Sequence, residues 1–356
     1  MLTNIVSFVF VLGILVFIHE LGHFLVAKRV GIKVERFSLG FPPNIFSKLW
    51  RGTTYCIGII PLGGYVKMAG EQPTEEATGA PDEFMSKSVG QRAAVIFAGP
   101  FMNYVLAILL LIGIFYFGGR PLADQTRVLV GEVVEDSPAE KAGLKADDVI
   151  IAINGEPVIR FDSLARRINA IVEKPLDLTW VHGQDTITSS IVTMAVPVPN
   201  AEGSMDTIGL IGFNQKIIGY EEYGLWESIT KGTVTAHVLV GQTVQFLSKL
   251  VSGQVSPKAI GGPLFIAQQS GREAKKGASN LFLFMALLSV NLAIINVLPI
   301  PVLDGGQLIF LAIEKFNGSP LSMKVRIIAQ QVGIVLVLSL IVMVTYNDII
   351  RVIQGF

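Results

Sequence analysis

Hydrophobic residues along this chain gather in four long runs, at residues 3–27, 93–118, 281–303 and 328–350. Each run provides the about 20 residues that an α-helix needs to cross the hydrocarbon core of a bilayer. The second and third runs contain proline, which is tolerated at membrane depth where neighbouring protein satisfies the freed backbone groups. The pattern predicts a polytopic α-helical membrane protein with about four transmembrane helices.

The first run lies so close to the N-terminus that a signal peptide is the alternative. The preceding residues MLTN carry no positive charge, and no small-residue cleavage site closes the run. Its basic neighbours, Lys28 and Arg29, follow it instead. We therefore predict that residues 1–30 form a retained transmembrane helix.

Between the second and third runs the pattern changes to short strands and turns. The stretch RVLVGEVVEDSPAEKAGLKADDVIIAINGEPV alternates strand-like and turn residues, and FDSLARRINAI predicts a helix that begins at Asp162 or Ser163. We predict one compact α/β domain within residues 119–215. Residues 216–280 have apolar positions at helical spacing but are too polar to span clearly, so we predict an interfacial amphipathic and linker region.

Residues 31–92, after the first run, predict a β-hairpin followed by an acidic loop. TTYCIGIIPLGGYVKMAG has two β-rich arms around Pro61, Gly63 and Gly64, and residues 71–83 are acidic and contain proline. The arms are unusually apolar for a loop beside a membrane. We therefore expect the hairpin to be membrane-associated and packed against protein.

Basic residues beside the runs indicate the orientation. They follow the first run, precede the second, and lie between the third and fourth at Lys315, Lys324 and Arg326. The positive-inside rule then places residues 31–92 and the loop 307–327 in the cytoplasm, and residues 119–280 outside it.

Composition agrees with a membrane protein. The chain is 51% hydrophobic and 16% charged, whereas soluble domains carry about 25% charged residues. The net charge of zero gives no support to nucleic-acid binding. Cys56 is the single cysteine, so an internal disulfide is excluded.

The first run carries the polar sequence HELGH, which is unusual in an apolar helix. His19 and His23 are four residues apart and therefore share one helix face. H-E-x-x-H is the arrangement in which two histidines bind zinc and the glutamate acts as general base. The alternative is a pair of structural histidines, but an ionised Glu20 in a membrane helix costs about 2.5–3.5 kcal/mol and is functional by default.

A catalytic zinc site usually has three protein ligands and one open position. The other histidines, His182 and His237, fall in the outer segment. The third ligand is therefore acidic or Cys56, and Asp304 in PVLDGG is the best carboxylate because it closes the third run on the side where His19 lies. Asp348 lies near the opposite end of the fourth run. The alternative role of Asp304 is that of a turn residue before two glycines.

Together with these motifs, the stretches GGYVKMAGE, FAGPFMNY, NLAIINVLPIPVLDGG and SPAEKAGL resemble the site-2 intramembrane zinc metalloproteases. The chain is most similar to the RseP-like bacterial type that cleaves anti-sigma factors. The resemblance covers almost the whole chain. It implies Zn²⁺ bound by His19, His23 and Asp304, with Glu20 activating water, in the bacterial inner membrane. The substrates it implies are single-pass transmembrane proteins.

The resemblance also implies that Asn296, and with less support Asn291 and Asn103, contact the substrate or stabilise the developing oxyanion. The alternative for these asparagines is interhelical hydrogen bonding, which is common in membranes. The hairpin resembles a membrane-entering β-element that offers a strand edge to an extended substrate, or alternatively a structural plug.

The α/β domain resembles a single extracytoplasmic PDZ domain of the bacterial protease type, with Asp147 where the family usually has glycine. Residues 208–213, IGLIGF, are either its carboxylate-binding loop, for an extracytoplasmic peptide, or a plain strand. The sequence has two alternative functions. A catalytically silent PDZ scaffold would not need Glu20, and a metal transporter would need polar residues along several spans.

Overall fold

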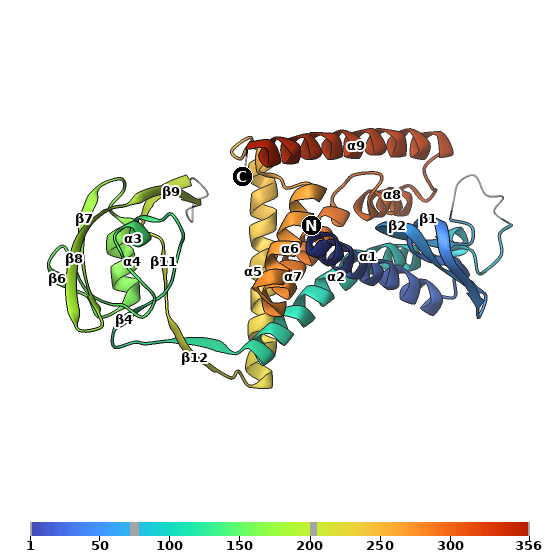
Figure 1. Ribbon diagram of the computed structural model, residues 1–356. Helices are drawn as coiled ribbons and strands as arrows, with labels where there is room; N and C mark the ends of the chain where they lie inside the picture. Colours follow the sequence, from blue (N-terminus) through green and yellow to red (C-terminus); the bar gives the residue numbers. More distant parts are fainter. Residues whose placement is uncertain (1, 72–77, 200–204, 355–356) are drawn as a thin grey trace. The chain divides into compact units, whose positions relative to one another are not determined.

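The computed structural model describes residues 2–71, 78–199 and 205–354. The chain divides into two compact units, Met1–Tyr116 with Leu225–Phe356, and Phe117–Gly224 (Figure 1). The first unit is mainly helical, and the second contains most of the strands. Residues 72–77, part of the predicted acidic loop 71–83, lie outside the described residues.

Four helices of the described chain are long and apolar enough to cross a membrane, and they match the four predicted spans. They are α1 (Leu2–Arg29), α2 (Val89–Gly118), α7 (Ala278–Val297) and α9 (Met323–Gln354). The predicted fold class, a polytopic helical membrane protein with a β-hairpin and an α/β domain, is confirmed. The unit's other helices are α5 (Leu225–Val251), α6 (Pro263–Lys276) and α8 (Asp304–Asn317), with the 3₁₀ turns η1 (Phe84–Ser86) and η2 (Pro257–Ala259).

The helix boundaries differ from the limits of the hydrophobic runs. α2 begins at Val89 and α9 at Met323, because both helices continue through polar residues at their N-terminal ends. α7 ends at Val297, earlier than the predicted end at 303, and Leu298 is extended. The residue before a proline is driven away from helical geometry, and Leu298 precedes Pro299. This early end leaves an irregular connection to α8, which begins at Asp304.

Helix α5 belongs to the segment predicted to be interfacial. Ala236 of α5 is fully buried in one apolar cluster with Ala107 and Leu111 of α2, and Ala286 and Val290 of α7. Small residues at such contacts allow helices to approach closely. Helix α5 therefore packs against two of the predicted spans, a contact that the sequence did not indicate.

Strands β1 (Val34–Trp50) and β2 (Thr53–Met68) form the predicted hairpin. The turn between them is at Arg51 and Gly52, which both have positive φ, and not at the predicted Pro61–Gly64. Phe37 pairs with Tyr55 and also with Val66, so β2 folds back along both sides of β1. The C-terminal part of β2, from Gly64 to Met68, is consequently an edge of this sheet.

The two ends of the hairpin have different surroundings. Val34, Phe37 and Val66 are buried in one cluster with Ala27 of α1 and Val95 of α2. The turn end is apolar and exposed on both faces, including Ile45, Phe46, Leu49 and Trp50. Since a two-sided apolar ribbon is poorly suited to water, this end supports the expected association with the membrane.

The second unit contains a six-stranded sheet in the order β11-β4-β5-β7-β8, with β6 paired to β5. These strands are β4 (Val128–Val133), β5 (Val149–Ile153), β6 (Glu156–Pro157), β7 (Pro175–His182), β8 (Asp185–Val192) and β11 (Phe213–Gln215). Two further pairs join β9 (Met194–Pro199) to β10 (Met205–Leu210), and β3 (Arg120–Ala123) to β12 (Ile217–Glu221).

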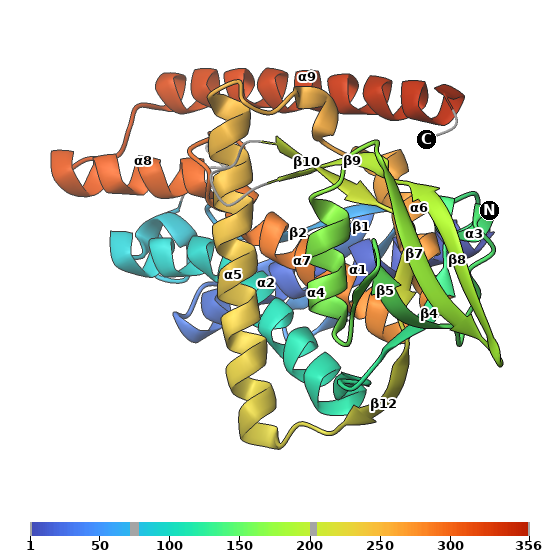
Figure 2. The ribbon, with the colours of Figure 1, turned by 90° about the vertical axis from the view of Figure 1, so that its left-hand side faces the viewer.

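Helices α3 (Pro138–Lys141) and α4 (Phe161–Asn169) pack on this sheet (Figure 2). Leu164 and Ile168 of α4 share one core cluster with the fully buried Trp180 of β7. Helix α4 starts at Phe161 with Arg160 at the N-cap, so the predicted start at Asp162 or Ser163 was slightly late. The unit extends past the predicted limit of 215 because β12 pairs with β3.

Candidate metal centre and catalytic cavity

Helix α1 and the first residue of α8 bring three potential metal ligands together. His19 Nε2 lies 3.2 Å from His23 Nε2 and 3.2 Å from Asp304 Oδ2. His23 Nε2 lies 3.7 Å from Asp304 Oδ1. All the ligand atoms lie within 4.8 Å of one another, and this is the one group of its kind among the described residues.

These separations fit a tetrahedral metal ion. Tetrahedral bonds of about 2.0–2.1 Å place the ligand atoms about 3.3 Å apart. Asp304 Oδ2 is buried and has no hydrogen-bond partner, although His19 Nε2 is its neighbour. A buried carboxylate oxygen that faces an imidazole nitrogen without a hydrogen bond between them is expected where both atoms bind a cation. The three residues therefore fit Zn²⁺ and leave a fourth position open.

Helix α2 supports the two histidines from the other side. His23 Nδ1 donates a hydrogen bond to the carbonyl oxygen of Val95 at 2.8 Å, which leaves Nε2 free to bind a metal. Gly99 faces both rings: a Cβ there would lie 2.4 Å from His23 Nε2 and 2.8 Å from His19 Cε1. A larger residue than glycine at position 99 is therefore excluded by the close approach of α1.

Asn103, one turn after Gly99, contacts the second histidine. Its Nδ2 lies 3.2 Å from His19 Nδ1, and its Oδ1 is buried without a partner. A histidine that binds metal through Nε2 carries its proton on Nδ1 and needs an acceptor there. Reversing the Asn103 amide would supply that acceptor and satisfy its oxygen. Asn103 is fully buried, so it lies against the His19 ring on the α2 side of the three candidate ligands.

The other two predicted asparagines lie on α7 in different surroundings. Asn296 Nδ2 lies 3.4 Å from His19 Nδ1 and 3.5 Å from Nε2, so it is beside the metal centre. Asn291 Oδ1 accepts a 2.7 Å hydrogen bond from Thr243 of α5. This hydrogen bond joins α7 to α5, which is the interhelical role given above as the alternative for Asn291.

Glu20 opens onto a cavity of ≈ 480 Å³ that also contains His19, His23 and Asp304. The edge of β2 forms one part of its wall, from Gly64 to Met68. A Cβ at Gly64 would lie 3.1 Å from Glu20 Cγ, so the edge strand and the glutamate are in direct proximity. Cavities of this size are typical of ligand sites.

The remaining candidate ligands lie elsewhere. His182 Nδ1 contacts Asp148 at 2.6 Å in the second unit, and His237 contacts Tyr104. Cys56 is buried beside Ser47, and Asp348 accepts hydrogen bonds from Gly262 and Phe265 at the start of α6.

Sequence reasoning missed several residues around the metal centre. Val95 acts through its backbone, so its side chain carries no signal. Gly99 had a weak signal, since it precedes Pro100 within an apolar run. Gln330 had a clearer signal, because it is a polar residue in a strongly apolar helix, and it lines the cavity.

Comparison with known proteins finds relatives that match nearly the whole chain. A putative zinc metalloprotease of Rhizobium meliloti is 36% identical over 369 residues, which are 97% of this chain and 96% of the relative. Zinc metalloprotease RasP of Oceanobacillus iheyensis and the regulator of sigma-E protease RseP of Salmonella typhimurium are each 31% identical, over 98% of this chain and 99% of each relative.

Among solved structures, the PDZ domain of an SdrC-like protein of Listeria monocytogenes aligns with 26% of this chain and 90% of its own length, at 21% identity and a TM-score of 0.21. Residues 7–340 match the sequence family described as Peptidase family M50. This match confirms the predicted resemblance to the site-2 metalloproteases and the prediction of an enzyme: the chain belongs to peptidase family M50.

Proposed function

We propose that this chain is an intramembrane zinc endopeptidase that hydrolyses peptide bonds within the transmembrane segments of single-pass membrane proteins. The observation that carries the proposal is the cluster of His19 and His23, in the candidate membrane span α1, with Asp304 at the start of α8, and this cluster faces the cavity that contains Glu20. The relatives named zinc metalloproteases support Zn²⁺ as the ion.

In this proposal the residues of the cavity have separate roles in peptide-bond hydrolysis. Bound by His19, His23 and Asp304, Zn²⁺ would acidify water and polarise a carbonyl. Glu20 lines the same cavity, so it takes the proton of the attacking water and returns it to the leaving amine. Asn296 lies beside His19 and is positioned to donate a hydrogen bond to the oxyanion that develops on the scissile carbonyl.

A transmembrane substrate must unwind before it can be cut, because its carbonyls are hydrogen-bonded within the helix. The edge of β2 borders the cavity and offers backbone groups that an extended segment can pair with. The substrate therefore binds as an added strand from Gly64 to Met68. One relative is named a regulator of sigma-E protease, which supports anti-sigma factors, besides remnants of signal peptides, as candidate substrates.

The second unit supplies a peptide-binding groove in this proposal. A small groove is lined by Leu164 and Ile168 of α4 and by residues 210–213. Gly212 has a φ of +90° and lies between β10 and β11, so IGLIGF is interrupted between the two strands and is not one continuous strand. Backbone N–H groups there would receive the carboxylate of an extracytoplasmic peptide. The basic residues beside the spans support this unit's position outside the cytoplasm, with residues 31–92 inside it.

The substitution Glu20→Gln tests the proposed function against a silent scaffold. We expect purified Glu20→Gln protein to retain zinc and to lose about 10²–10⁴-fold in the cleavage rate of a synthetic single-pass peptide, since it lacks the general base. Glu227→Gln, at an exposed position on α5, is the matched control and should cleave normally. Undiminished cleavage by Glu20→Gln would overturn the mechanism.

A further inference from the structure

An unwound substrate in this cavity has hydrogen-bonding groups along both of its edges. Pairing with β2 satisfies only the edge that faces Gly64 to Met68. The backbone groups of the opposite edge are then left without protein partners at membrane depth, where an unsatisfied N–H or C=O group is costly. A site built for unwound segments therefore needs polar groups on the side away from β2.

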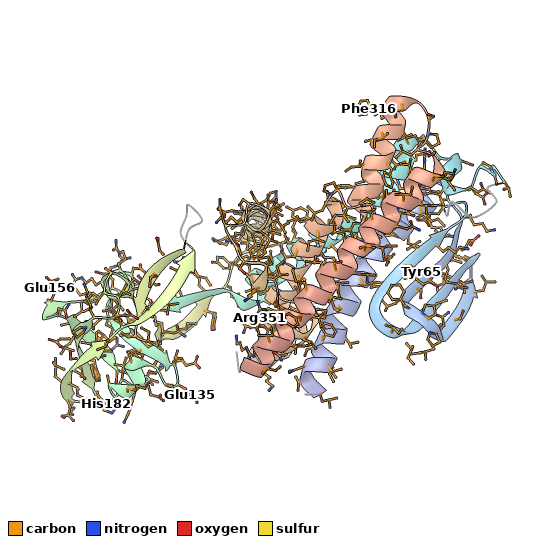
Figure 3. All side chains as sticks on the ribbon, turned by 90° about the horizontal axis from the view of Figure 1, so that it is seen from above. Tyr65, Glu135, Glu156, His182, Phe316 and Arg351 are labelled. Carbon is orange, nitrogen blue, oxygen red and sulfur yellow. The ribbon has the colours of Figure 1, made fainter. Side chains whose placement is uncertain are left out.

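Helices α8 and α9 supply polar groups to the same cavity. Besides the proposed ligand Asp304, the residues of these two helices that line it are Gln307, Arg326 and Gln330. In Figure 1, α8 and α9 lie above the β1–β2 sheet. Seen from above, the half of α9 away from Arg351 lies beside the sheet that carries Tyr65 (Figure 3).

The positions of these side chains follow from helical spacing. Arg326 and Gln330 are four residues apart and lie on one face of α9, and Gln307 is three residues from Asp304 on α8. Most of the other residues in the central part of α9 are apolar. Polar residues within such a helix normally face a cavity or a partner. The next residue, Gln331, is exposed and is not among the residues that line the cavity.

These side chains are available for a ligand. Arg326 Nε is buried and has no hydrogen-bond partner among the described residues. A glutamine amide both donates and accepts, as a peptide backbone does, whereas an arginine offers donors only. The two glutamines can therefore pair with N–H and C=O groups alternately, and Arg326 can pair with a carbonyl.

We propose that Gln307, Arg326 and Gln330 bind the second backbone edge of the unwound substrate, opposite β2. This inference rests on the proposed function and names the substrate-binding residues of that same cavity. Because these contacts are made to backbone groups, they do not depend on the side chains of the substrate. Segments of different sequence can therefore bind in the same way. Selectivity then depends on how readily a transmembrane segment unwinds.

Binding can be measured without cleavage in the Glu20→Gln protein. The probe is a fluorescent synthetic single-pass peptide in nanodiscs. We expect Gln307→Met and Gln330→Met each to weaken its binding about 3- to 20-fold, the range for one hydrogen bond in a membrane. Methionine keeps the length of glutamine, and Gln331→Met is the matched control that should bind like the parent. Zinc content and thermal midpoint should stay at the parent values, which separates lost binding from lost folding.

Single ester replacements in the probe test the contact directly, because an ester lacks the N–H of the amide. We expect at least one ester position near the cleavage site to weaken binding to the parent but not to Gln330→Met. The proposal is overturned if both methionine variants bind like the parent, or if every ester has the same effect on parent and variant. These outcomes are independent of whether Glu20→Gln abolishes cleavage, which decides the proposed function.

Discussion

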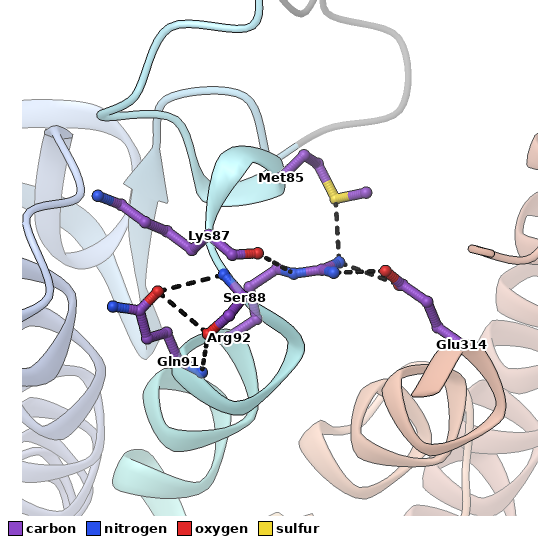
Figure 4. Close-up of polar contacts among 6 residues, drawn as sticks. All are labelled: Met85, Lys87, Ser88, Gln91, Arg92 and Glu314. Carbon is purple, nitrogen blue, oxygen red and sulfur yellow. Dashed lines mark hydrogen bonds and ion pairs between the residues drawn. The ribbon is translucent and has the colours of Figure 1, made fainter. Parts of the chain in front are cut away.

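Arg92 of α2 and Glu314 of α8 form a bidentate ion pair inside the protein (Figure 4). The two contacts are 3.0 and 2.5 Å long, and Arg92 is only 4% exposed. Arg92 lies in the first turn of α2 and Glu314 in the last turn of α8. Each charge therefore lies at the helix end where the helix dipole disfavours it. The pair consequently does not stabilise α2 or α8 through their dipoles. It ties α2, which supports the histidines, to α8, which begins at Asp304.

Breaking this pair from one side should destabilise the protein. We expect Glu314→Leu alone to lower the free energy of unfolding by about 3–5 kcal/mol, because it leaves the buried Arg92 guanidinium without its carboxylate partner, with only the Lys87 carbonyl and the Met85 sulfur beside it. The double variant Arg92→Met with Glu314→Leu should recover most of that loss. Thermal unfolding in detergent measures both, and a double variant as unstable as the single one would contradict the prediction.

Gly99→Ala should abolish metal binding. The added Cβ would lie 2.4 Å from His23 Nε2, and the backbone of α2 cannot retreat without moving the Val95 carbonyl that orients the same ring. Elemental analysis of the purified variant should find zinc strongly depleted. Gly113→Ala, in the same helix with no atom within 4 Å of the added Cβ, is the control and should retain its zinc.

Asn103→Ala should weaken zinc binding without removing a ligand. Loss of the partner that orients a metal-binding histidine typically costs 10- to 100-fold in metal affinity. Competition with a calibrated chelator measures the change. Asn103→Asp keeps an acceptor for His19 Nδ1 and should bind zinc more tightly than Asn103→Ala. Equal affinities of the two variants would argue against the orienting contact.

Asp147→Gly should stabilise the second unit. Asp147 has a φ of +75°, a conformation that glycine adopts without strain. The substitution also removes an exposed contact with Lys216, which is worth little. We expect a net gain of about 0.5–1 kcal/mol. Chemical denaturation of the full chain should detect it, and a lower unfolding midpoint would contradict the prediction.

Much of the helical architecture could be predicted because hydrophobic length is a local signal. The four spans were visible as apolar runs, yet the break between α7 and α8 was hidden within one of them. Pro299 and Pro301 marked it, but they did not say where the helix would stop. In the hairpin, Pro61 and the following glycines looked like the turn, whereas β2 continues through them and folds back along β1. The pairing of β2 with both sides of β1 therefore decided where the turn lies.

The candidate site was also only partly predictable from the sequence. The spacing of His19 and His23 on one helix face follows from the period of the α-helix, and Asp304 was the carboxylate of choice because of its place at the end of an apolar run. Which asparagine would touch a histidine could not be predicted, since Asn103, Asn291 and Asn296 all lie in apolar runs. Their roles depend on how α2 and α7 rotate against α1, and packing sets that rotation.

The sequence by itself determined which segments are apolar enough for a membrane and which polar residues lie among them, because hydropathy and helical periodicity act over a few residues. The tertiary structure alone decided that the Val95 carbonyl and Gly99 face the histidines, that the edge of β2 borders Glu20, and that Gln307 and Gln330 open onto the same cavity. These relationships join distant parts of the chain. They depend on close packing between helices and on strand pairing, which no local pattern specifies.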